Sequence, residues 1–477
     1  AIKAFNAGVA IETPSGDTYA LLKRAIDEGK ITPASLDQAV AGVLKPKFAL
    51  GLFENPYVDE KKADACVGSE AARKVALRAA EQSIVLLKND SNTLPLNKKA
   101  LKSIAVIGPH INETLLGGYS DVPRRTTTIL QGIKNYLGPK VVVNSALGVK
   151  ITEDNWQPGS DSIAAQSLSK ERWNRNVITP ADPQKNRALI KEAVAVAAQS
   201  DVTVVVVGDN EGTSREAWGE EHLGDRTDIT LFGEQQELVD ALLALGKPTV
   251  VVLNNGRPLA IEKIHSTAPA IIEAWYLGQE TGTALARVLF GEVNPGGKLP
   301  VSIARSVGQL PVYYNYKPTA KRGYAFTDTT PLYPFGHGLS YSQFTYSDLT
   351  FERDQLAPTD TLKAKIKITN TSAVGGDEVV QLYISDAVAS LTRPVKELKA
   401  FKRIHLKAKQ SRWLEFNVPV ALMGFYSEAL QYQVEPGKIT IQVGSSSQDI
   451  RQQKNLMITG DGPVSLPKQF FAQVREL

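Results

Sequence analysis

Residues that could do chemistry gather in one polar stretch of the chain, residues 208–228. Its sequence is GDNEGTSREAWGEEHLGDRTD, with arginine, histidine and Trp218 standing among carboxylates. The carboxylates are Asp209, Glu211, Glu216, Glu220, Glu221, Asp225 and Asp228. A tryptophan beside carboxylates suits sugar recognition, because an aromatic face covers the C–H face of a pyranose ring while carboxylates bond its hydroxyls. A solvated acidic loop with the tryptophan as its anchor remains the alternative.

The position of this stretch also favours a function. It follows a buried run of β-branched residues, 202–207, and is much longer than the 2–6 residues that usually join a strand to a helix. In open sheets of parallel strands, ligands bind in the loops beyond the carboxyl ends of the strands. The loops after residues 107, 253 and 275 should reach the same edge.

Alternating helices and strands position these loops. Continuous apolar strands between amphipathic helices predict a parallel sheet that is covered on both faces. The predicted strands are 103–107, 202–207, 249–253 and 270–275, and the predicted helices are 71–87, 186–198, 235–245 and 281–289.

The two ends of the chain have other patterns. Residues 1–60 read as a helical pair whose core is too small to stand alone, so it should lean on something else. From residue 345, short strands of alternating polarity predict a β-sandwich. Residues 306–344 form a connector rich in proline, tyrosine and glycine, which we expect to pack against both neighbours.

Composition and missing motifs exclude several classes of protein. The chain is 43% hydrophobic and 22% charged with a net charge of +4, the balance of a soluble multidomain protein without a basic face for nucleic acid. It has no apolar run long enough for a transmembrane helix. A single cysteine, Cys66, excludes an internal disulfide and a cysteine-based metal cluster. Phosphate-loop, dinucleotide and nucleophilic-serine motifs are absent from the sequence, and the histidine spacing supports no metal site. We therefore expect neither a metal nor an organic cofactor.

Many co-linear segments resemble glycoside hydrolase family 3, the β-glucosidase and β-xylosidase family. They include AFNAGVAIETPSGDTYALL, GLFENPYVD, AAEQSIVLLKND, IAVIGP, LVDALLALGKPTVVVLNNGRPLAI, GQETGTALARVLFGEVNPGGKLPVS, YPFGHGLSYSQFTYS, GGDEVVQLYIS and RPVKELKAFKR. The resemblance extends over nearly the whole chain.

This resemblance implies a (β/α)8 barrel, then an α/β sandwich, then a fibronectin type III-like β-sandwich. We expect residues 1–60 to be the last helices of the barrel, 61–305 the α/β sandwich, 306–344 the connector and 345–477 the fibronectin type III-like domain. A barrel needs roughly 250 residues. Most of it, with the nucleophilic aspartate of the family, is therefore expected upstream of this chain.

The resemblance also implies that a glutamate of the polar loop is the catalytic acid/base. Glu216 fits best, because residues 216–219 match the family's Glu-x-x-Gly form and Arg226-Thr-Asp228 follows. Glu220 and Glu221 are the alternatives. Trp218, Arg215 and His222 are candidates for binding substrate, although each could instead anchor the loop. Arg215 is expected to point toward Asp209 or Glu211 rather than toward the acid/base.

The implied activity is that of an exo-acting retaining β-glucosidase on β-linked gluco-oligosaccharides or aryl glucosides, competent only with the barrel. Two alternatives stay open: a β-xylosidase of the same family, and a non-catalytic carbohydrate-binding or assembly module. We further expect a periplasmic or secreted protein, with a homodimer as a possible assembly.

Overall fold

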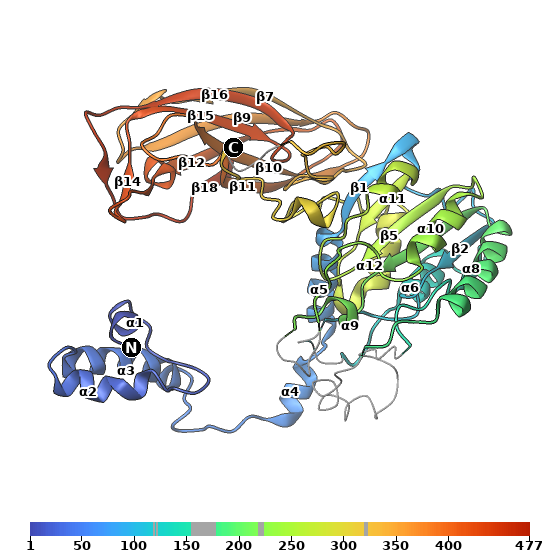
Figure 1. The fold of residues 1–477 in the computed structure, drawn as a ribbon, viewed down its shortest axis with the longest axis horizontal. Coiled ribbons are helices and arrows are strands. Elements are labelled where there is room, and N and C mark those ends of the chain that lie inside the picture. Colours follow the sequence, from blue (N-terminus) through green and yellow to red (C-terminus); the bar gives the residue numbers. More distant parts are fainter. Residues whose placement is uncertain (118–119, 121–122, 154–177, 218–223, 319–322) are drawn as a thin grey trace. The chain divides into compact units, whose positions relative to one another are not determined.

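The computed structural model describes the chain except for residues 118–119, 121–122, 154–177, 218–223 and 319–322 (Figure 1). The chain divides into two compact units, Ala1–Ser69 and Glu70–Leu477.

The first unit, all of whose residues are described, is helical as predicted. Its helices are α1 (Ile2–Asn6), α2 (Leu22–Asp27), α3 (Pro33–Ala49) and α4 (Glu60–Cys66). Helix α3 begins where the Thr32 hydroxyl accepts a hydrogen bond from the Ser35 backbone N–H at 3.1 Å, with Pro33 in the first turn. The buried apolar core of this unit consists of Phe5, Leu22, Ala25 and Ile31, and α3 buries none of its residues.

A mixed sheet forms the centre of the second unit. Within the described residues the strand order is β1-β6-β5-β4-β2-β3. The strands are β1 (Val85–Asn89), β2 (Ser103–Ile107), β3 (Val142–Ala146), β4 (Val202–Gly208), β5 (Thr249–Asn254) and β6 (Ala270–Glu273). All neighbours are parallel except β1 and β6, which are antiparallel with Val85 opposite Glu273. The prediction of a mostly parallel sheet is confirmed, and the antiparallel neighbour within the described residues is the edge strand β1.

The helix predicted over residues 71–87 is too long. Helix α5 (Glu70–Ser83) ends before β1, and residues Val85, Leu86 and Leu87 are buried in the edge strand. Polar residues 81–83 separate the helix from the apolar run 84–87. The prediction extended the helix across this boundary, whereas pairing of β1 with β6 makes the apolar run a strand.

Helices cover both faces of this sheet (Figure 1). One core contains residues of α5, α6 (Ile129–Leu137) and α12 (Thr281–Leu289), and the other contains residues of α8 (Pro183–Ala198), α10 (Gln235–Leu243) and α11 (Glu262–Thr267). Every residue of β4 is buried. The sheet is thus a rigid support for the loops at its carboxyl edge.

Two glycines mark where the chain leaves the sheet toward that edge. A Cβ atom on Gly108, just after β2, would lie 1.9 Å from the Val206 carbonyl oxygen. A Cβ atom on Gly208, at the end of β4, would lie 2.0 Å from the Asn254 carbonyl oxygen. Neighbouring backbones can approach this closely only where no side chain intervenes.

The C-terminal part is a β-sandwich, as predicted. In the described residues its two main sheets have the orders β11-β10-β15-β16-β8 and β18-β12-β9-β7. Strand β9 (Thr361–Asn370) alternates exposed and buried residues, which is the pattern of a sheet with one face in a core. The other strands are β7 (Phe344–Phe351), β8 (Gln355–Leu356), β10 (Gly376–Asp386), β11 (Glu397–Leu406), β12 (Ser411–Pro419), β15 (Gly437–Gly444), β16 (Ile450–Ile458) and β18 (Gln473–Glu476), with β13 (Phe425–Tyr426), β14 (Tyr432–Val434) and β17 (Val464–Ser465) in a small third sheet.

The connector packs against both neighbours, as predicted. Its Leu339 N–H donates to the Leu86 carbonyl of β1 at 2.8 Å. On the β-sandwich side, the Gln381 side chain donates to the Gly336 carbonyl at 3.2 Å, and the Ser447 N–H donates to the Phe335 carbonyl at 2.9 Å. These contacts make the connector a structural part of both neighbouring domains rather than a flexible linker.

Candidate active site

The polar loop begins with a tightly bonded turn. After Gly208 the chain forms the short helix α9 (Glu211–Ser214), capped by Asn210. The Asn210 side chain accepts from the Thr213 N–H at 3.1 Å, and the Thr213 hydroxyl accepts from the Asn210 N–H at 3.2 Å. This reciprocal capping box satisfies two backbone donors, and both side chains are buried. The first half of the loop is therefore held in one conformation.

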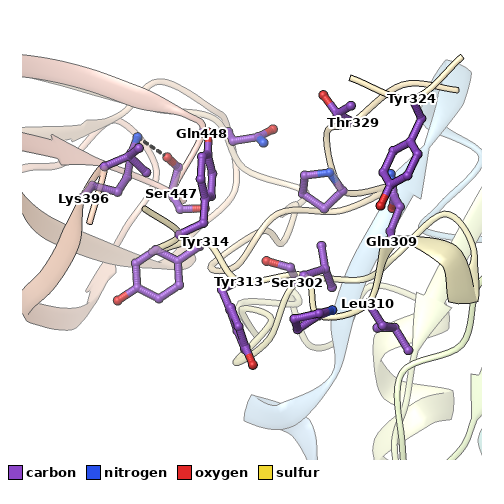
Figure 2. Close-up of a pocket in the computed structure, with 15 residues that line it drawn as sticks. Ser302, Gln309, Leu310, Tyr313, Tyr314, Tyr324, Thr329, Lys396, Ser447 and Gln448 are labelled. Carbon is purple, nitrogen blue, oxygen red and sulfur yellow. Dashed lines mark hydrogen bonds between the residues drawn. The ribbon is translucent and has the colours of Figure 1, made fainter. Parts of the chain in front are cut away.

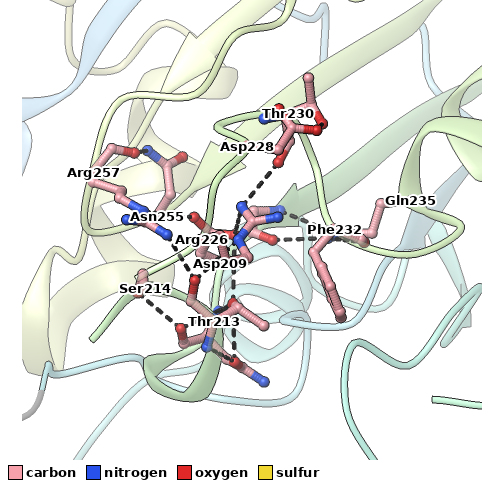
Figure 3. A network of polar contacts seen from close by, with 12 residues as sticks. Asp209, Thr213, Ser214, Arg226, Asp228, Thr230, Phe232, Gln235, Asn255 and Arg257 are labelled. Carbon is pink, nitrogen blue, oxygen red and sulfur yellow. Dashed lines mark hydrogen bonds and ion pairs between the residues drawn. The ribbon is translucent and has the colours of Figure 1, made fainter. Parts of the chain in front are cut away.

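Asp209 is the buried charge at the centre of this turn (Figure 3). It is 0% exposed, with Oδ1 3.2 Å from Arg226 Nη2 and Oδ2 3.8 Å from Arg257 Nε. Burial raises the pKa of this carboxyl, while the two arginines act in the opposite direction. A buried carboxylate is costly without partners, so the fold depends on both arginines staying close to Asp209. Asp209 thereby connects the turn after β4 with the segments that carry Arg226 and Arg257.

The same two arginines also bind the end of α9. Arg226 Nε donates to the Thr213 carbonyl at 3.1 Å, and Arg257 Nη2 donates to the same carbonyl at 2.8 Å. A helix leaves its last carbonyls without partners, and cations near that end are favourable. The arginines thus fix the point at which the chain turns out of α9 toward residue 216.

Glu216 itself is exposed to solvent. The backbone on either side of it is held by Asp225, whose N–H donates to the Arg215 carbonyl at 2.8 Å and whose Oδ2 accepts from the Ala217 N–H at 3.3 Å. Asp225 Oδ1 lies 4.0 Å from Arg257 Nη1, which links this contact to the Asp209 cluster. The result is an exposed carboxylate on a backbone that is anchored before and after it.

Neighbouring loops at the same edge add further buried polar groups. Tyr276, after β6, donates its hydroxyl to the Asp209 carbonyl at 3.0 Å, and burial raises its pKa to about 12. Glu273 is fully buried at the end of β6, where it accepts from the Trp275 N–H at 3.0 Å and from the Asn255 side chain at 3.3 Å. Burial raises the pKa of Glu273 to about 8. This edge therefore holds a carboxyl group that is mainly protonated at neutral pH.

His110, in the loop after β2, also belongs to this edge. It is 1% exposed, its Nδ1 lies 3.8 Å from Glu113 Oε2, and its charge when protonated acts on Asp209. The polar groups that follow β2, β4, β5 and β6 are thus brought together, as expected for the carboxyl edge of a parallel sheet.

The structure describes two of the residues predicted for the site. Glu216 is exposed, and Arg215 is half-buried. Burial lowers the pKa of Arg215 and Glu211 opposes this effect, so Glu211 is the one of the two expected carboxylates that acts on it. Trp218, Glu220, Glu221 and His222 lie outside the described residues.

Two polar residues at this edge of the sheet were not predicted from the sequence. Tyr276 and Glu273 are not singled out by any motif, although an acidic residue that ends an apolar strand is a signal that could have found Glu273. The strand predicted over residues 270–275 is two residues too long, because β6 ends at Glu273. Trp275 has a positive φ of 56°, and its N–H turns back to the Glu273 carboxyl. Arg257, which lies 3.8 Å from Asp209, forms a structural ion pair in this cluster.

Two other kinds of site are absent from the described residues. Among them, no three histidine, cysteine or acidic side chains are grouped as metal ligands. None of the described helices is both long and apolar enough to cross a membrane.

Comparisons with known proteins point to one family. Residues 84–341 match the glycosyl hydrolase family 3 C-terminal domain, and residues 378–447 match a fibronectin type III-like domain. The chain is 38% identical to a periplasmic beta-glucosidase of Salmonella typhimurium and 39% identical to a beta-xylosidase of Formosa agariphila, in both cases over 94% of this chain and 59% of the relative. The solved structure of a β-glucosidase from Erythrobacter marinus matches with a TM-score of 0.83 and 39% identity, over 96% of this chain and 60% of that one.

These matches cover the fold described above and the loop that carries Glu216. The chain spans about three-fifths of the length of the curated relatives it matches. Because the family model alone covers more than half of the chain, the chain belongs to glycosyl hydrolase family 3.

Proposed function

We propose that this chain is part of an exo-acting retaining β-glucosidase, in which Glu216 is the general acid/base. The observation that carries the proposal is an exposed carboxylate on a doubly anchored loop, at the edge of the sheet where ligands bind in such folds. Family membership and relatives named beta-glucosidase support it.

The proposed chemistry uses Glu216 twice. As an acid it gives its proton to the glycosidic oxygen while a second carboxylate attacks the sugar, and as a base it then takes a proton from the water that releases the sugar. A proton must be delivered within hydrogen-bond reach of the reacting oxygen. Anchoring of the backbone at Arg215 and Ala217 restricts where the Glu216 carboxyl can lie, which serves this requirement.

The second carboxylate is proposed to come from a (β/α)8 barrel outside these 477 residues, with residues 1–60 as its last helices. Retaining glycosidases place their two carboxyl groups about 5–5.5 Å apart, so the barrel must meet the loop closely. The first unit supports this role, because large apolar side chains on it are exposed. They include Phe48 (60% exposed), Leu50 (72%) and Phe53 (56%). Such surfaces are typical of elements that pack against further protein.

The assignment of Glu216 is tested by leaving-group dependence in the enzyme that carries the barrel. Glu216→Ala should slow hydrolysis of cellobiose by about a hundredfold or more, because its poor leaving group needs a proton. Hydrolysis of 2,4-dinitrophenyl β-glucoside should fall far less, and azide should restore it. Equal losses on both substrates would reject Glu216 in favour of Glu220 or Glu221, which receive the same test.

Glu237→Ala is the matched control for that experiment. Glu237 is also an exposed carboxylate of this domain, and it forms an ion pair with Arg187 at 2.9 Å. Its substitution should leave both rates unchanged. A similar loss in Glu237→Ala would mean that the effect of Glu216→Ala is not specific to the acid/base.

The sugar specificity has a second candidate, a β-xyloside. The beta-xylosidase relative is as similar to this chain as the beta-glucosidase relative, with 39% and 38% identity. Comparing kcat/KM for nitrophenyl β-glucoside and β-xyloside decides between them. Activity on neither, with binding of oligosaccharide retained, would favour the alternative of a non-catalytic carbohydrate-binding module.

Two further proposals concern the setting of the enzyme. A periplasmic or secreted location is supported by the relative named as periplasmic. The possible homodimer remains a proposal that sedimentation analysis would test.

A further inference from the structure

A pocket of about 550 Å³ lies between the connector and two turns of the β-sandwich. One turn precedes β11 and carries Lys396, and the other follows β15 and carries Ser447 and Gln448. Figure 2 shows Lys396 and Ser447 on one side of the pocket, with Tyr324 and Thr329 on the opposite side. A cavity of this size is within the range that holds small ligands. Among the lining residues that the structure describes, none belongs to the loop of Glu216.

Tyrosine side chains from the connector contribute to the apolar lining, beside leucine, proline and valine. Tyr313 is 64% exposed and Tyr324 is 57% exposed. The Tyr324 hydroxyl donates to the Gly308 carbonyl at 3.1 Å, and Tyr314 stacks on Phe335 with ring centroids 4.3 Å apart. The pocket thus presents aromatic rings of which two are tied to the connector by their own contacts. Rigid aromatic rings give a large contact area at a low entropy cost.

Polar groups at the pocket are suited to hydroxyl groups. Lys396 Nζ donates to the Ser447 carbonyl at 2.6 Å, which holds the ammonium at the wall and uses one of its three donors. Partial burial lowers the pKa of Lys396. Thr329 and Gln448 add neutral donors and acceptors. The lining residues that the structure describes include no carboxylate, so a cationic ligand would find no counter-charge there.

We propose that this pocket is a second carbohydrate-binding site, which takes one or two rings of a neutral β-linked gluco-oligosaccharide. The tyrosine faces would cover the C–H faces of the sugar, and Lys396, Thr329 and Gln448 would bond its hydroxyls. The site requires neither Glu216 nor any other catalytic group. It rests on the proposed function only for the choice of glucose as the sugar.

Calorimetric titration of the chain with cellobiose and cellotriose tests the proposal. Tyr313→Ala and Lys396→Met should each weaken binding by about tenfold. Tyr313→Phe keeps the ring and should stay within about threefold of the unchanged protein. Tyr426→Ala, which truncates a tyrosine of β13 that is 49% exposed and lies outside the pocket, should bind normally. Circular dichroism checks that each variant folds.

Glu216→Gln separates this proposal from the proposed function. It should bind both sugars unchanged at the tyrosine pocket, even though it is expected to be inactive in hydrolysis. Absence of binding by the unchanged chain would overturn the proposal. So would binding that is lost in Glu216→Gln but kept in Tyr313→Ala, since the sugar would then lie at the acid/base loop.

Discussion

Two adjoining segments of the loop after β4, called its two halves below, place a carboxylate in opposite environments. In residues 209–214 the carboxylate of Asp209 is fully buried and lies between two arginines, inside a capped turn. In residues 215–217 the carboxylate of Glu216 is exposed, and only the backbone is held. The first segment stabilises the fold, and the second presents the carboxylate that is proposed as the acid/base. Stability and the proposed chemistry are therefore carried by different residues of one short segment.

This separation has a physical reason. An acid/base must change its protonation state during the reaction, whereas a charge held in a buried ion-pair network cannot do so without destabilising the network. In the proposed mechanism Glu216 exchanges protons with substrate and water, and within the described residues it belongs to no buried ion pair. Asp209 has the other role, because its buried ion pairs with Arg226 and Arg257 hold the turn. A variant that changed both stability and the proposed acid/base activity would contradict this division between Asp209 and Glu216.

The largest expected effect is that of Asp209→Ala on stability. It leaves Arg226 and Arg257 without their buried partner, which should lower the free energy of unfolding by about 3–5 kcal/mol. Asp209→Asn keeps the shape and should cost less, because burial already disfavours the charged form of this carboxyl. Urea unfolding followed by tryptophan fluorescence measures both, with Glu237→Ala as the control. A stable Asp209→Ala variant would contradict the anchoring role.

A second test uses the pH dependence of Glu273, the other buried carboxyl at this edge. Its pKa is raised from 4.5 to about 8, so between these values the folded protein holds a proton that the unfolded chain has released. Stability should therefore fall as pH rises through this window and level off above about 8. Glu273→Gln should remove about 3–4 kcal/mol of the loss between about pH 5 and 8. Parallel stability curves for the variant and the unchanged protein would show that Glu273 is not protonated.

A smaller effect is expected for Asp225, which connects the two halves. Asp225→Ala removes the bond to the Ala217 N–H and places alanine at a positive φ of 44°, which should cost about 1 kcal/mol. Hydrogen exchange of the Ala217 amide should become faster. Asp225→Asn retains an acceptor and tolerates this backbone conformation, so its exchange should change little. Equal exchange in the two variants would mean that the side chain does not hold the loop.

The smallest effect is predicted for the stability of Glu216→Gln. Since Glu216 is exposed, its free energy of unfolding should stay within about 0.5 kcal/mol of the unchanged protein. The same urea measurement as for Asp209→Ala provides the number. A large loss would show that Glu216 belongs to the anchor, and the comparison between the two halves would fail.

Much of the fold can be predicted from the sequence because the central strands are fully buried. Strands predicted over 103–107, 202–207 and 249–253 coincide with β2, β4 and β5 to within one residue. Continuous β-branched runs with glycine or asparagine after them leave little ambiguity. The sequence pattern does not predict β3, an edge strand whose residues are exposed or half-buried, because burial on both faces is what makes the other strands recognisable.

The site could be predicted only in part, for a related reason. The polar loop and its glutamates can be found in the sequence because polar residues are concentrated there. The family resemblance then selects Glu216 among them. The anchor depends on contacts between Asp209, Arg257 and Tyr276, which come from three different loops. Local patterns carry no information about such long-range pairs. Folding brings them together, so structure was needed to find them.

The glycines at the ends of β2 and β4 determine which sequence changes the site can accept. A side chain at Gly108 or Gly208 would collide with the backbone of the neighbouring strand, at 1.9 and 2.0 Å. No compensating side-chain change can relieve a clash with backbone. The exposed Ala217 should therefore tolerate substitution far better than either glycine, whereas Glu216 is constrained by its proposed role. The loops after β2 and β4 can change in sequence without moving the points from which they start.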